Sequence, residues 1–179
     1  MIPSSWQSEN LDFSLFEDKD VQEVQRIFEA NNALGDSDPT FRSYPLKEYQ
    51  ALIDRDVTNS ENLDKPSFYL RKISKQGVSV GYVQIELDTP EQGKCWLPML
   101  VLIPTEQSGG LGREIVSSVL WQIEANEKYT SIGLNVYAEN PKALMFWFKN
   151  GFTKISGVDH EVTNYKSYTC ITLWREFHT

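Results

Sequence analysis

A nearly continuous apolar run from Trp96 to Ile103, stopped by Pro104, constrains the fold of this chain more than any other segment. A strand with one solvated face alternates apolar and polar residues, so this run indicates a strand that is covered on both faces. Glycines follow the run, and the apolar residues between Leu111 and Ile123 then recur at the spacing of an amphipathic helix. These segments predict an α/β domain in which Trp96–Ile103 is the central strand.

The remaining patterns predict further strands and helices on both sides of this unit. Alternation predicts strands at Leu11–Leu15, Phe68–Ile73, Val78–Leu87, Ile132–Tyr137, Thr153–Ser156 and Ser167–Trp174. Helical spacing predicts helices over Val21–Phe28, after Pro45 and from Asn140–Pro141 to Gly151. A polar connection is expected between the last two strands. No repeat, low-complexity tract or linker divides the chain, so we expect one domain.

Charge and composition limit the classes of function. The net charge of this 179-residue chain is −8 and its Lys and Arg residues are not clustered, which argues against nonspecific nucleic-acid binding. The N-terminus lacks a cationic region followed by an apolar run, and no stretch approaches the ~20 apolar residues of a membrane helix. We therefore expect a cytoplasmic protein with no nucleic-acid or membrane partner. Cys95 and Cys170 lie far apart among apolar residues, which favours packing over a redox or metal role.

The segment Pro104–Gly112 joins the central strand to the following helix and carries a chemical signal. Its glycines allow a ligand to approach backbone N–H groups closely, and the helix N-terminus adds a partial positive charge. Together with Arg113, the segment is a candidate cradle for a pyrophosphate. It is not a P-loop, because no Gly-Lys-Ser/Thr follows, and its glycine spacing differs from the dinucleotide fingerprint. A tight turn without a ligand is the alternative interpretation.

The glycine loop and a later segment that begins at Asn140 form two motifs. Both resemble motifs of the GCN5-related N-acetyltransferase superfamily, in the same order along the chain. The acyl-CoA loop of that family reads Gln or Arg, two residues, Gly, one residue, Gly or Ala, and it is matched here by Gln107, Gly110 and Gly112. The later motif of the family is matched at its spacings by Asn140, Ala143, Gly151 and Phe152. One helix and one strand separate the two motifs, and the order of elements resembles the family from Leu11 to Phe177.

The resemblance implies a fold and an activity. The fold is a single α/β (α+β) domain over residues 1–179, with residues 1–10 as an N-terminal extension. Its central sheet is mixed, mostly antiparallel and twisted, with about seven strands flanked by about four helices. The activity is transfer of an acetyl group from acetyl-CoA, as acyl-donor substrate, to a primary amine by direct attack in a ternary complex.

Several alternatives stay open at this point. The acceptor is either a small cationic amine or a protein amine, and a homodimer is among the assemblies that the sequence permits. A catalytically silent acyl-CoA-binding regulatory module on the same fold is the alternative to an enzyme. No metal is expected in either case.

The resemblance also implies which residues bind acetyl-CoA. Backbone groups of the central strand would pair with the pantetheine arm, the glycine loop would hold the pyrophosphate, and the later motif would reach the thiol end. The residues implied are Leu100, Val101, Leu102, Gln107, Ser108, Gly109, Gly110, Leu111, Gly112, Arg113, Asn140, Ala143 and Phe146. The two predicted strands Trp96–Ile103 and Ile132–Tyr137 would separate to admit the arm.

The catalytic residues follow the family pattern less closely. The tyrosine that often stands seven residues after the motif asparagine, as acid for the leaving thiolate, is replaced by Trp147. Tyr137 is our substitute for this acid, with cross-strand packing as the alternative role. The central strand carries no carboxylate, so Glu86 on the neighbouring strand is the candidate base, with an exposed solubilising carboxylate as the alternative.

Overall fold

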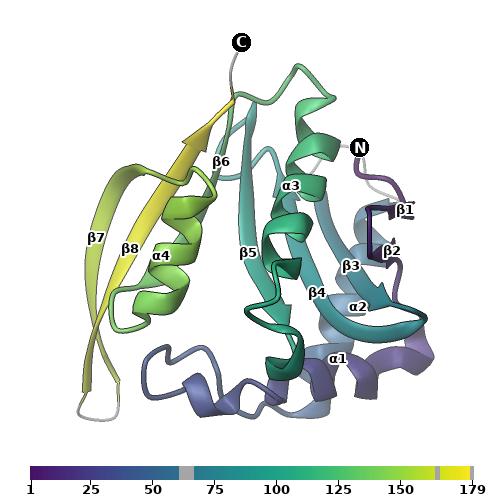
Figure 1. Cartoon of the computed structure of the whole chain (residues 1–179), viewed down its shortest axis with the longest axis horizontal. Coiled ribbons are helices and arrows are strands. Elements are labelled where there is room, and N and C mark those ends of the chain that lie inside the picture. Colours follow the sequence, from purple (N-terminus) through teal and green to yellow (C-terminus); the bar gives the residue numbers. More distant parts are fainter. Residues whose placement is uncertain (61–66, 164–165, 178–179) are drawn as a thin grey trace.

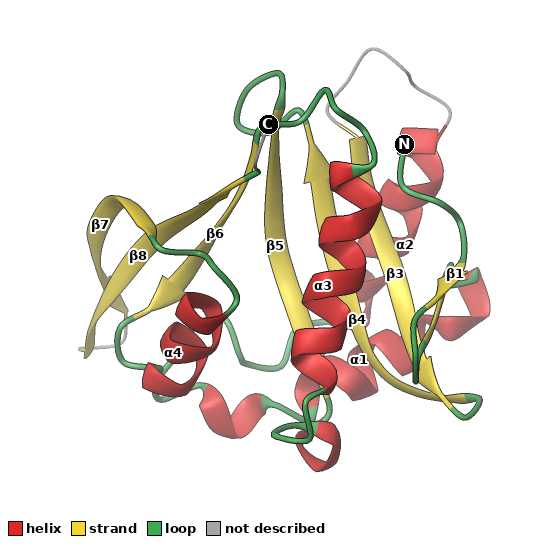
Figure 2. Cartoon of the chain, turned by 45° about the horizontal axis from the view of Figure 1, so that its top comes forward, coloured by secondary structure: helices red, strands yellow, loops and turns green. Residues whose placement is uncertain are grey.

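A twisted sheet runs through the protein, with α-helices packed on both of its faces (Figures 1 and 2). The computed structural model describes residues 1–60, 67–163 and 166–177, and the described sheet has eight strands. The strands are β1 (Trp6–Gln7), β2 (Asp12–Ser14), β3 (Ser67–Lys75), β4 (Val78–Leu87), β5 (Lys94–Leu102), β6 (Ser131–Tyr137), β7 (Lys154–Thr163) and β8 (Lys166–Glu176). The α-helices are α1 (Val21–Glu29), α2 (Leu46–Ser60), α3 (Leu111–Glu124) and α4 (Pro141–Lys149), and short 3-10 helices occupy Asp18–Asp20, Asn32–Leu34 and Pro104–Glu106.

The strand order is β1-β2-β3-β4-β5-β6-β8-β7. The pair β5 and β6 is parallel and each of the other neighbouring pairs is antiparallel. A parallel pair needs a crossover connection, and α3 supplies it between β5 and β6. The mixed, mostly antiparallel sheet predicted from the sequence is therefore confirmed, with β5 in its interior.

Two apolar clusters hold the helices against opposite faces of the sheet. One cluster joins α3 to the sheet through residues such as Ile115, Val119, Ile85 and Ile132, each at most 1 % exposed. The other joins α1 and α2 to β3, β4 and β5 through Ile27, Ile53, Phe68, Leu70 and Tyr82. Because both faces of β5 are covered, the apolar run from Trp96 becomes an interior strand whose residues are buried or half-buried. Cys95 and Cys170 are both buried.

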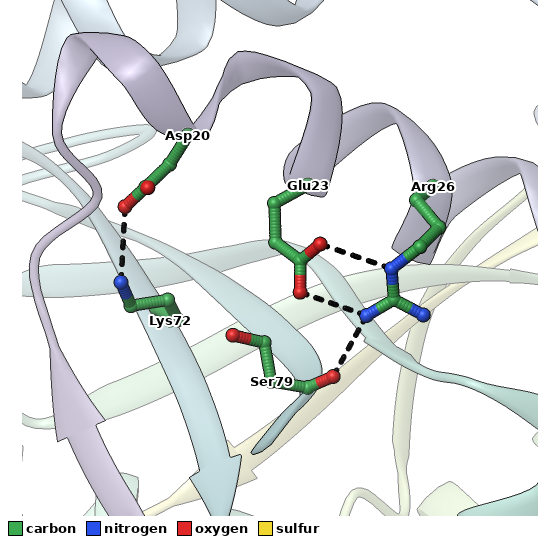
Figure 3. A network of polar contacts seen from close by, with 5 residues as sticks. All are labelled: Asp20, Glu23, Arg26, Lys72 and Ser79. Atoms are coloured by element: carbon green, nitrogen blue, oxygen red, sulfur yellow. Dashed lines mark hydrogen bonds and ion pairs between the residues drawn. The ribbon is translucent and has the colours of Figure 1, made fainter. Parts of the chain in front are cut away.

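Polar contacts also attach α1 to the sheet (Figure 3). Asp20, which precedes α1, accepts a hydrogen bond from the ammonium of Lys72 on β3 at 3.0 Å. Arg26 of α1 donates to both carboxylate oxygens of Glu23 and to the backbone carbonyl of Ser79 on β4, the latter at 2.8 Å. Helix α1 is thus held to two neighbouring strands by directional bonds in addition to its apolar face.

Two strands differ from the sequence prediction. The segment expected as an N-terminal extension contains β1, in which Trp6 pairs with Phe13 of β2 and stacks on its ring at 4.4 Å. The prediction of a short strand at Thr153–Ser156 followed by a polar connection is wrong, because β7 continues to Thr163. Strand β7 is an edge strand with most residues exposed on both faces, so it lacks the alternation that identifies a half-buried strand. No helix among the described residues is long and apolar enough to cross a membrane.

Candidate functional site

Strands β5 and β6 separate along their length, and this separation defines the candidate site. Pairing is confined to Lys94 with Ser131, Cys95 with Ile132 and Trp96 with Gly133. Beyond Trp96 the strands diverge toward their C-terminal ends (Figure 2). A register shift between β4 and β5 places one extra residue of β5 at this point, since Gln84 pairs with Met99 but Glu86 pairs with Trp96. The predicted separation of the two strands is therefore present.

The backbone of β5 presents hydrogen-bonding groups to this opening. Ile103 donates its N–H to Val80 of β4, so the alternation of an antiparallel ladder directs the peptide groups of Val101 to β4 as well. The N–H and C=O groups of Leu100 and Leu102 then point away from β4, toward β6. Of the three predicted pantetheine-binding residues, Leu100 and Leu102 thus face the opening with their backbones and Val101 does not.

The glycine loop lies at the open end of this separation, where α3 begins. Within the described chain, the backbone N–H groups from Ser108 to Gly112 donate to no protein acceptor. Gly110 adopts a φ of +90°, and a Cβ atom added at Gly109 or Gly110 would meet nothing within 4 Å. Arg113 in the first turn of α3 is exposed and forms no ion pair with a described residue. Five consecutive free donors beside a helix N-terminus suit an anionic group.

Gln107 has a different position from the one expected of an anion ligand. Its side-chain amide donates to the carbonyl oxygen of Leu102 and to Oδ1 of Asn31, both at 2.8 Å. Asn31 in turn donates to the same Leu102 oxygen at 3.1 Å. Gln107 therefore anchors the loop to the end of β5 and to the segment after α1, and leaves the backbone of the loop to meet a ligand.

Helix α4 begins at the end of β6, so its N-terminus lies at the same open end as that of α3. Asn140 is 8 % exposed and caps α4, with its Oδ1 accepting the N–H of Ala143 at 3.2 Å. Phe146 lies against the first turn of α3, because a Cβ atom added to Gly112 would be 3.0 Å from its ring. Trp147 is buried between Phe146 and Phe152, at ring-centroid distances of 4.8 and 5.2 Å. Trp147 is thus a core residue.

The two predicted catalytic residues lie on the face of the sheet that α1 and α2 cover. Cross-strand partners share a face, and Tyr137 pairs with Cys170 while Glu86 pairs with Phe68 and Trp96. The carboxylate of Glu86 forms an ion pair with Arg55 of α2 at 2.7 Å. Glu86 lies beside the paired end of β5 and β6, whereas Tyr137 lies on the separated part of β6.

Tyr137 is held by an acidic residue of the β7 strand. Its hydroxyl donates to Oε2 of Glu161 at 3.0 Å, and its ring packs edge-on against Tyr168 at 5.8 Å. Burial first, and then the hydrogen bond to Glu161, raises the pKa of Tyr137 above its usual value. Burial also raises the pKa of Asp38, with Glu161 contributing in the same direction. A phenol with a raised pKa is a weaker proton donor to a thiolate.

The segment between α1 and α2 spans the opening on this face. Asn31 ties it to the end of β5, and the Tyr168 hydroxyl of β8 donates to the Gly35 carbonyl at 3.4 Å. The ammonium of Lys166 donates to the carbonyl oxygen of Asp36. This segment therefore bridges the two halves of the separated sheet, beside Tyr137 and Glu161.

Sequence reasoning missed Gln84, which shares a face with Glu86 on β4. Gln84 is 9 % exposed and pairs with Leu70 and Met99. The signal was present in the strand pattern, because Gln84 and Glu86 are two residues apart and therefore project from the same face. Apolar residues would satisfy packing at these two positions, so two polar residues on the covered face of an otherwise apolar strand indicate a functional role.

A concavity of about 760 Å³ borders the glycine loop on the side away from α4. It is lined by Gln7 to Asn10, Gly109, Gly110 and the exposed side of α3, including Arg113 and Trp121. It does not include the predicted catalytic residues. No group of His, Cys, Asp and Glu among the described residues has the arrangement of a metal site.

Solved structures share this architecture over nearly their whole length. An acetyltransferase from Thermus thermophilus is 21% identical, with a TM-score of 0.66 over 96% of this chain and 100% of that one. A Salmonella typhimurium acetyltransferase that modifies the N-terminal serine of ribosomal protein L7/L12 is 12% identical, with a TM-score of 0.79 over 99% of each chain. The microcin C7 self-immunity acetyltransferase MccE, solved with acetyl-CoA and AMP, is 14% identical, with a TM-score of 0.77 over 98% of this chain and 97% of that one.

The sequence comparisons give a family but no individual relative. No curated protein matches the sequence significantly. Residues 27–152 match the family described as "Acetyltransferase (GNAT) family". The match begins in α1 and ends just after α4, so it includes the separated strands, the glycine loop and the Asn140 cap.

Proposed function

Because the chain belongs to the acetyltransferase (GNAT) family, we propose that it transfers the acetyl group of acetyl-CoA to a primary amine by direct attack in a ternary complex. The observation that carries this proposal is the separation of β5 from β6 beside the glycine loop. A strand edge with free peptide groups suits the amides of the pantetheine arm, and the loop suits its pyrophosphate. Solved structures of this fold that contain acetyl-CoA or CoA support the choice of acyl donor.

The residues proposed to bind acetyl-CoA divide into three groups. Leu100 and Leu102 offer backbone groups to pantetheine, although the Leu102 carbonyl already accepts from Asn31 and Gln107. The N–H groups from Ser108 to Gly112 and the charge of Arg113 receive the pyrophosphate. Asn140, Ala143 and Phe146 line the wall on the side of α4. These groups lie at the C-terminal ends of two parallel strands, where two helix N-termini also lie.

The proposed chemistry needs positioning more than activation. The neutral amine nitrogen attacks the thioester carbonyl carbon, a carbon–nitrogen bond forms, and the carbon–sulfur bond then breaks to release the CoA thiolate. The amine loses one proton and the thiolate gains one, so the products are an acetamide and CoA with a free thiol. We propose Glu86 as the residue that receives the amine proton, directly or through water, and Tyr137 as the donor to the thiolate. Glu86 must do so while it is paired with Arg55.

Acidic groups near Tyr137, beside the separated part of β6, favour a cationic amine as acceptor. Asp38, Asp159 and Glu161 lie close enough to Cys170 to raise the pKa of its thiol, after burial as the main cause. The chain as a whole carries a net charge of −8. An ammonium substrate is attracted to such a field, which raises its local concentration near the opening.

The test is CoA release with a panel of amines. Purified protein is mixed with acetyl-CoA and a polyamine, an amino acid amide, an aminoglycoside or a peptide with a free N-terminus. Free thiol is measured and the product identified by its added acetyl mass. We expect amine-dependent CoA release with at least one class. Binding of acetyl-CoA without release for any amine supports instead the silent acyl-CoA-binding module.

A further inference from the structure

Gln84 is a mostly buried polar side chain without a protein partner, on the face of the sheet that α1 and α2 cover and beside the separation of β5 and β6. It is 9 % exposed, and its amide forms no hydrogen bond with any residue that the structure describes. A mostly buried side-chain amide usually has a protein partner, an ordered water or a ligand as its hydrogen-bond partner.

The amide of Gln84 is reachable from outside. Among the side-chain polar atoms of the described chain, only Oδ1 of Asn32 lacks both a hydrogen-bond partner and contact with solvent. The Gln84 amide has no hydrogen-bond partner either, so its polar atoms must be in contact with solvent. A polar group of a ligand can therefore reach it without displacing a protein bond.

The strand register places Gln84 beside the separated part of the sheet. Gln84 pairs with Met99, which lies on β5 beyond Trp96, the last residue of β5 that pairs with β6. Glu86, in contrast, pairs with Trp96 at the closed end. Gln84 and Glu86 are two residues apart on β4, about 6.6 Å along the strand, and share the face covered by α1 and α2.

A second buried polar group lies next to Gln84. Tyr82 precedes it by two residues on the same face and is 1 % exposed. Its hydroxyl forms no hydrogen bond to a residue in the described ranges, and burial raises its pKa well above the usual value. Tyr82, Gln84 and Glu86 thus place three polar groups along one face of β4. Tyr82 lies in the apolar cluster under α1 and α2, and Glu86 lies nearest the paired end of β5 and β6.

On the basis of the proposed function, we infer that Gln84 binds the acceptor amine and orients it toward the thioester. The Oε1 atom accepts one N–H of the amine. A carboxamide carries no charge, so it favours the ammonium form over the neutral, reactive amine much less than a carboxylate does. A carboxylate at the same place would favour the ammonium form, whose nitrogen has no free electron pair.

The experiment compares Gln84→Met, Gln84→Glu and the wild type with the best amine of the panel. Gln84→Met keeps the side-chain length and removes the amide. We expect kcat/KM for the amine to fall about tenfold to a hundredfold, with KM for acetyl-CoA unchanged. The melting temperature should stay the same or rise, because a thioether tolerates burial without a hydrogen bond.

Gln84→Glu gives a readout that a structural role would not move. The new carboxylate stabilises the ammonium form, so we expect KM for the amine to fall, kcat to fall, and the acidic limb of the kcat profile to move to higher pH. Gln50→Met on α2, whose amide bonds to Asp54 at the surface, is the matched control and should change neither KM.

The outcomes separate the two proposals. A wild type that turns over an amine, together with a Gln84→Met variant of unchanged kinetics, overturns the role of Gln84 alone. A wild type that releases no CoA with any amine overturns the proposed function and the Gln84 assignment with it. A tenfold loss in kcat/KM for the amine at a preserved melting temperature supports both.

Discussion

At the scale of single residues, Gly110 tests whether the loop binds acetyl-CoA or is only a turn. Gly110 and Gly77 have φ values of +90° and +79°, and neither has an atom within 4 Å of an added Cβ. Asp at either position should therefore cost a similar amount of stability, about 1–2 kcal/mol of left-handed strain. Only Gly110→Asp places a carboxylate beside the free N–H groups, so we expect calorimetry to show acetyl-CoA binding at least about tenfold weaker for this variant alone. Equal affinities of the two variants for acetyl-CoA would exclude the loop as the acetyl-CoA binding site.

Asn140 combines two roles that a matched pair of substitutions separates. Its Oδ1 caps α4, and losing a cap costs about 1 kcal/mol. Serine is an equally good cap but lacks the amide donors, so Asn140→Ser should keep the melting temperature that Asn140→Ala lowers. If Asn140 also binds acetyl-CoA, both variants lose turnover to a similar degree. Full turnover in Asn140→Ser would show that Asn140 caps α4 and does not bind acetyl-CoA.

At the scale of elements, the turn between β1 and β2 holds the first turn of α3, which is part of the proposed pyrophosphate site. Glu114 accepts from the Ser8 hydroxyl at 2.6 Å, the Asn10 N–H at 2.7 Å and the Asn10 side-chain amide at 3.0 Å. Burial alone would raise the pKa of Glu114, but these hydrogen bonds outweigh it and hold the pKa below the usual value. The bonds therefore stabilise the fold above the unfolded pKa of about 4.3, and this contribution is lost as pH falls through the lower folded pKa.

The Glu114 contacts predict a pH-dependent difference in stability. Glu114→Gln should lower the free energy of unfolding at pH 7 by about 0.5–1 kcal/mol, a value that allows for solvent screening. The difference from the wild type should shrink below about pH 4, as the wild-type carboxylate becomes protonated. Urea unfolding at several pH values measures this. Glu124→Gln, at the other end of α3 and 3.7 Å from Arg175, is the surface control. A difference that does not change with pH would contradict the assigned role.

At the scale of the whole molecule, Arg71 joins three distant parts of the chain. This side chain of β3 is 3 % exposed, and it donates to the Pro3 carbonyl at 2.8 Å and to the Asp56 carboxylate of α2 at 3.0 Å. Arg71→Ala removes a buried guanidinium and leaves the half-buried Asp56 without its cation, so we expect the free energy of unfolding to fall by about 3–5 kcal/mol. Adding Asp56→Asn should restore part of this loss in a double-mutant cycle. A loss below about 1 kcal/mol, or no recovery in the double variant, would contradict this role.

The sequence by itself determined the elements that a local pattern of apolar residues specifies. The apolar run of β5, the helical spacing of α3 and the alternation of β4 depend on neighbours within a few residues, and each of these elements was predicted close to its observed bounds. The free N–H groups from Ser108 to Gly112 follow from the same local chemistry, because glycines precede a helix start. The motif positions Gly110 and Asn140 were therefore accessible to sequence reasoning.

Only the tertiary structure decided which distant residues share the site. The two-residue strand β1 and the edge strand β7 form by pairing with neighbours, and neither carries a burial period of its own. Gln107 bonds to Asn31 and Tyr137 bonds to Glu161, whereas Gln84 has no partner within the described chain. Each of these outcomes depends on the register between strands and on the helices packed against them. Local propensity does not specify such long-range contacts, since they are set by the packing of the whole sheet.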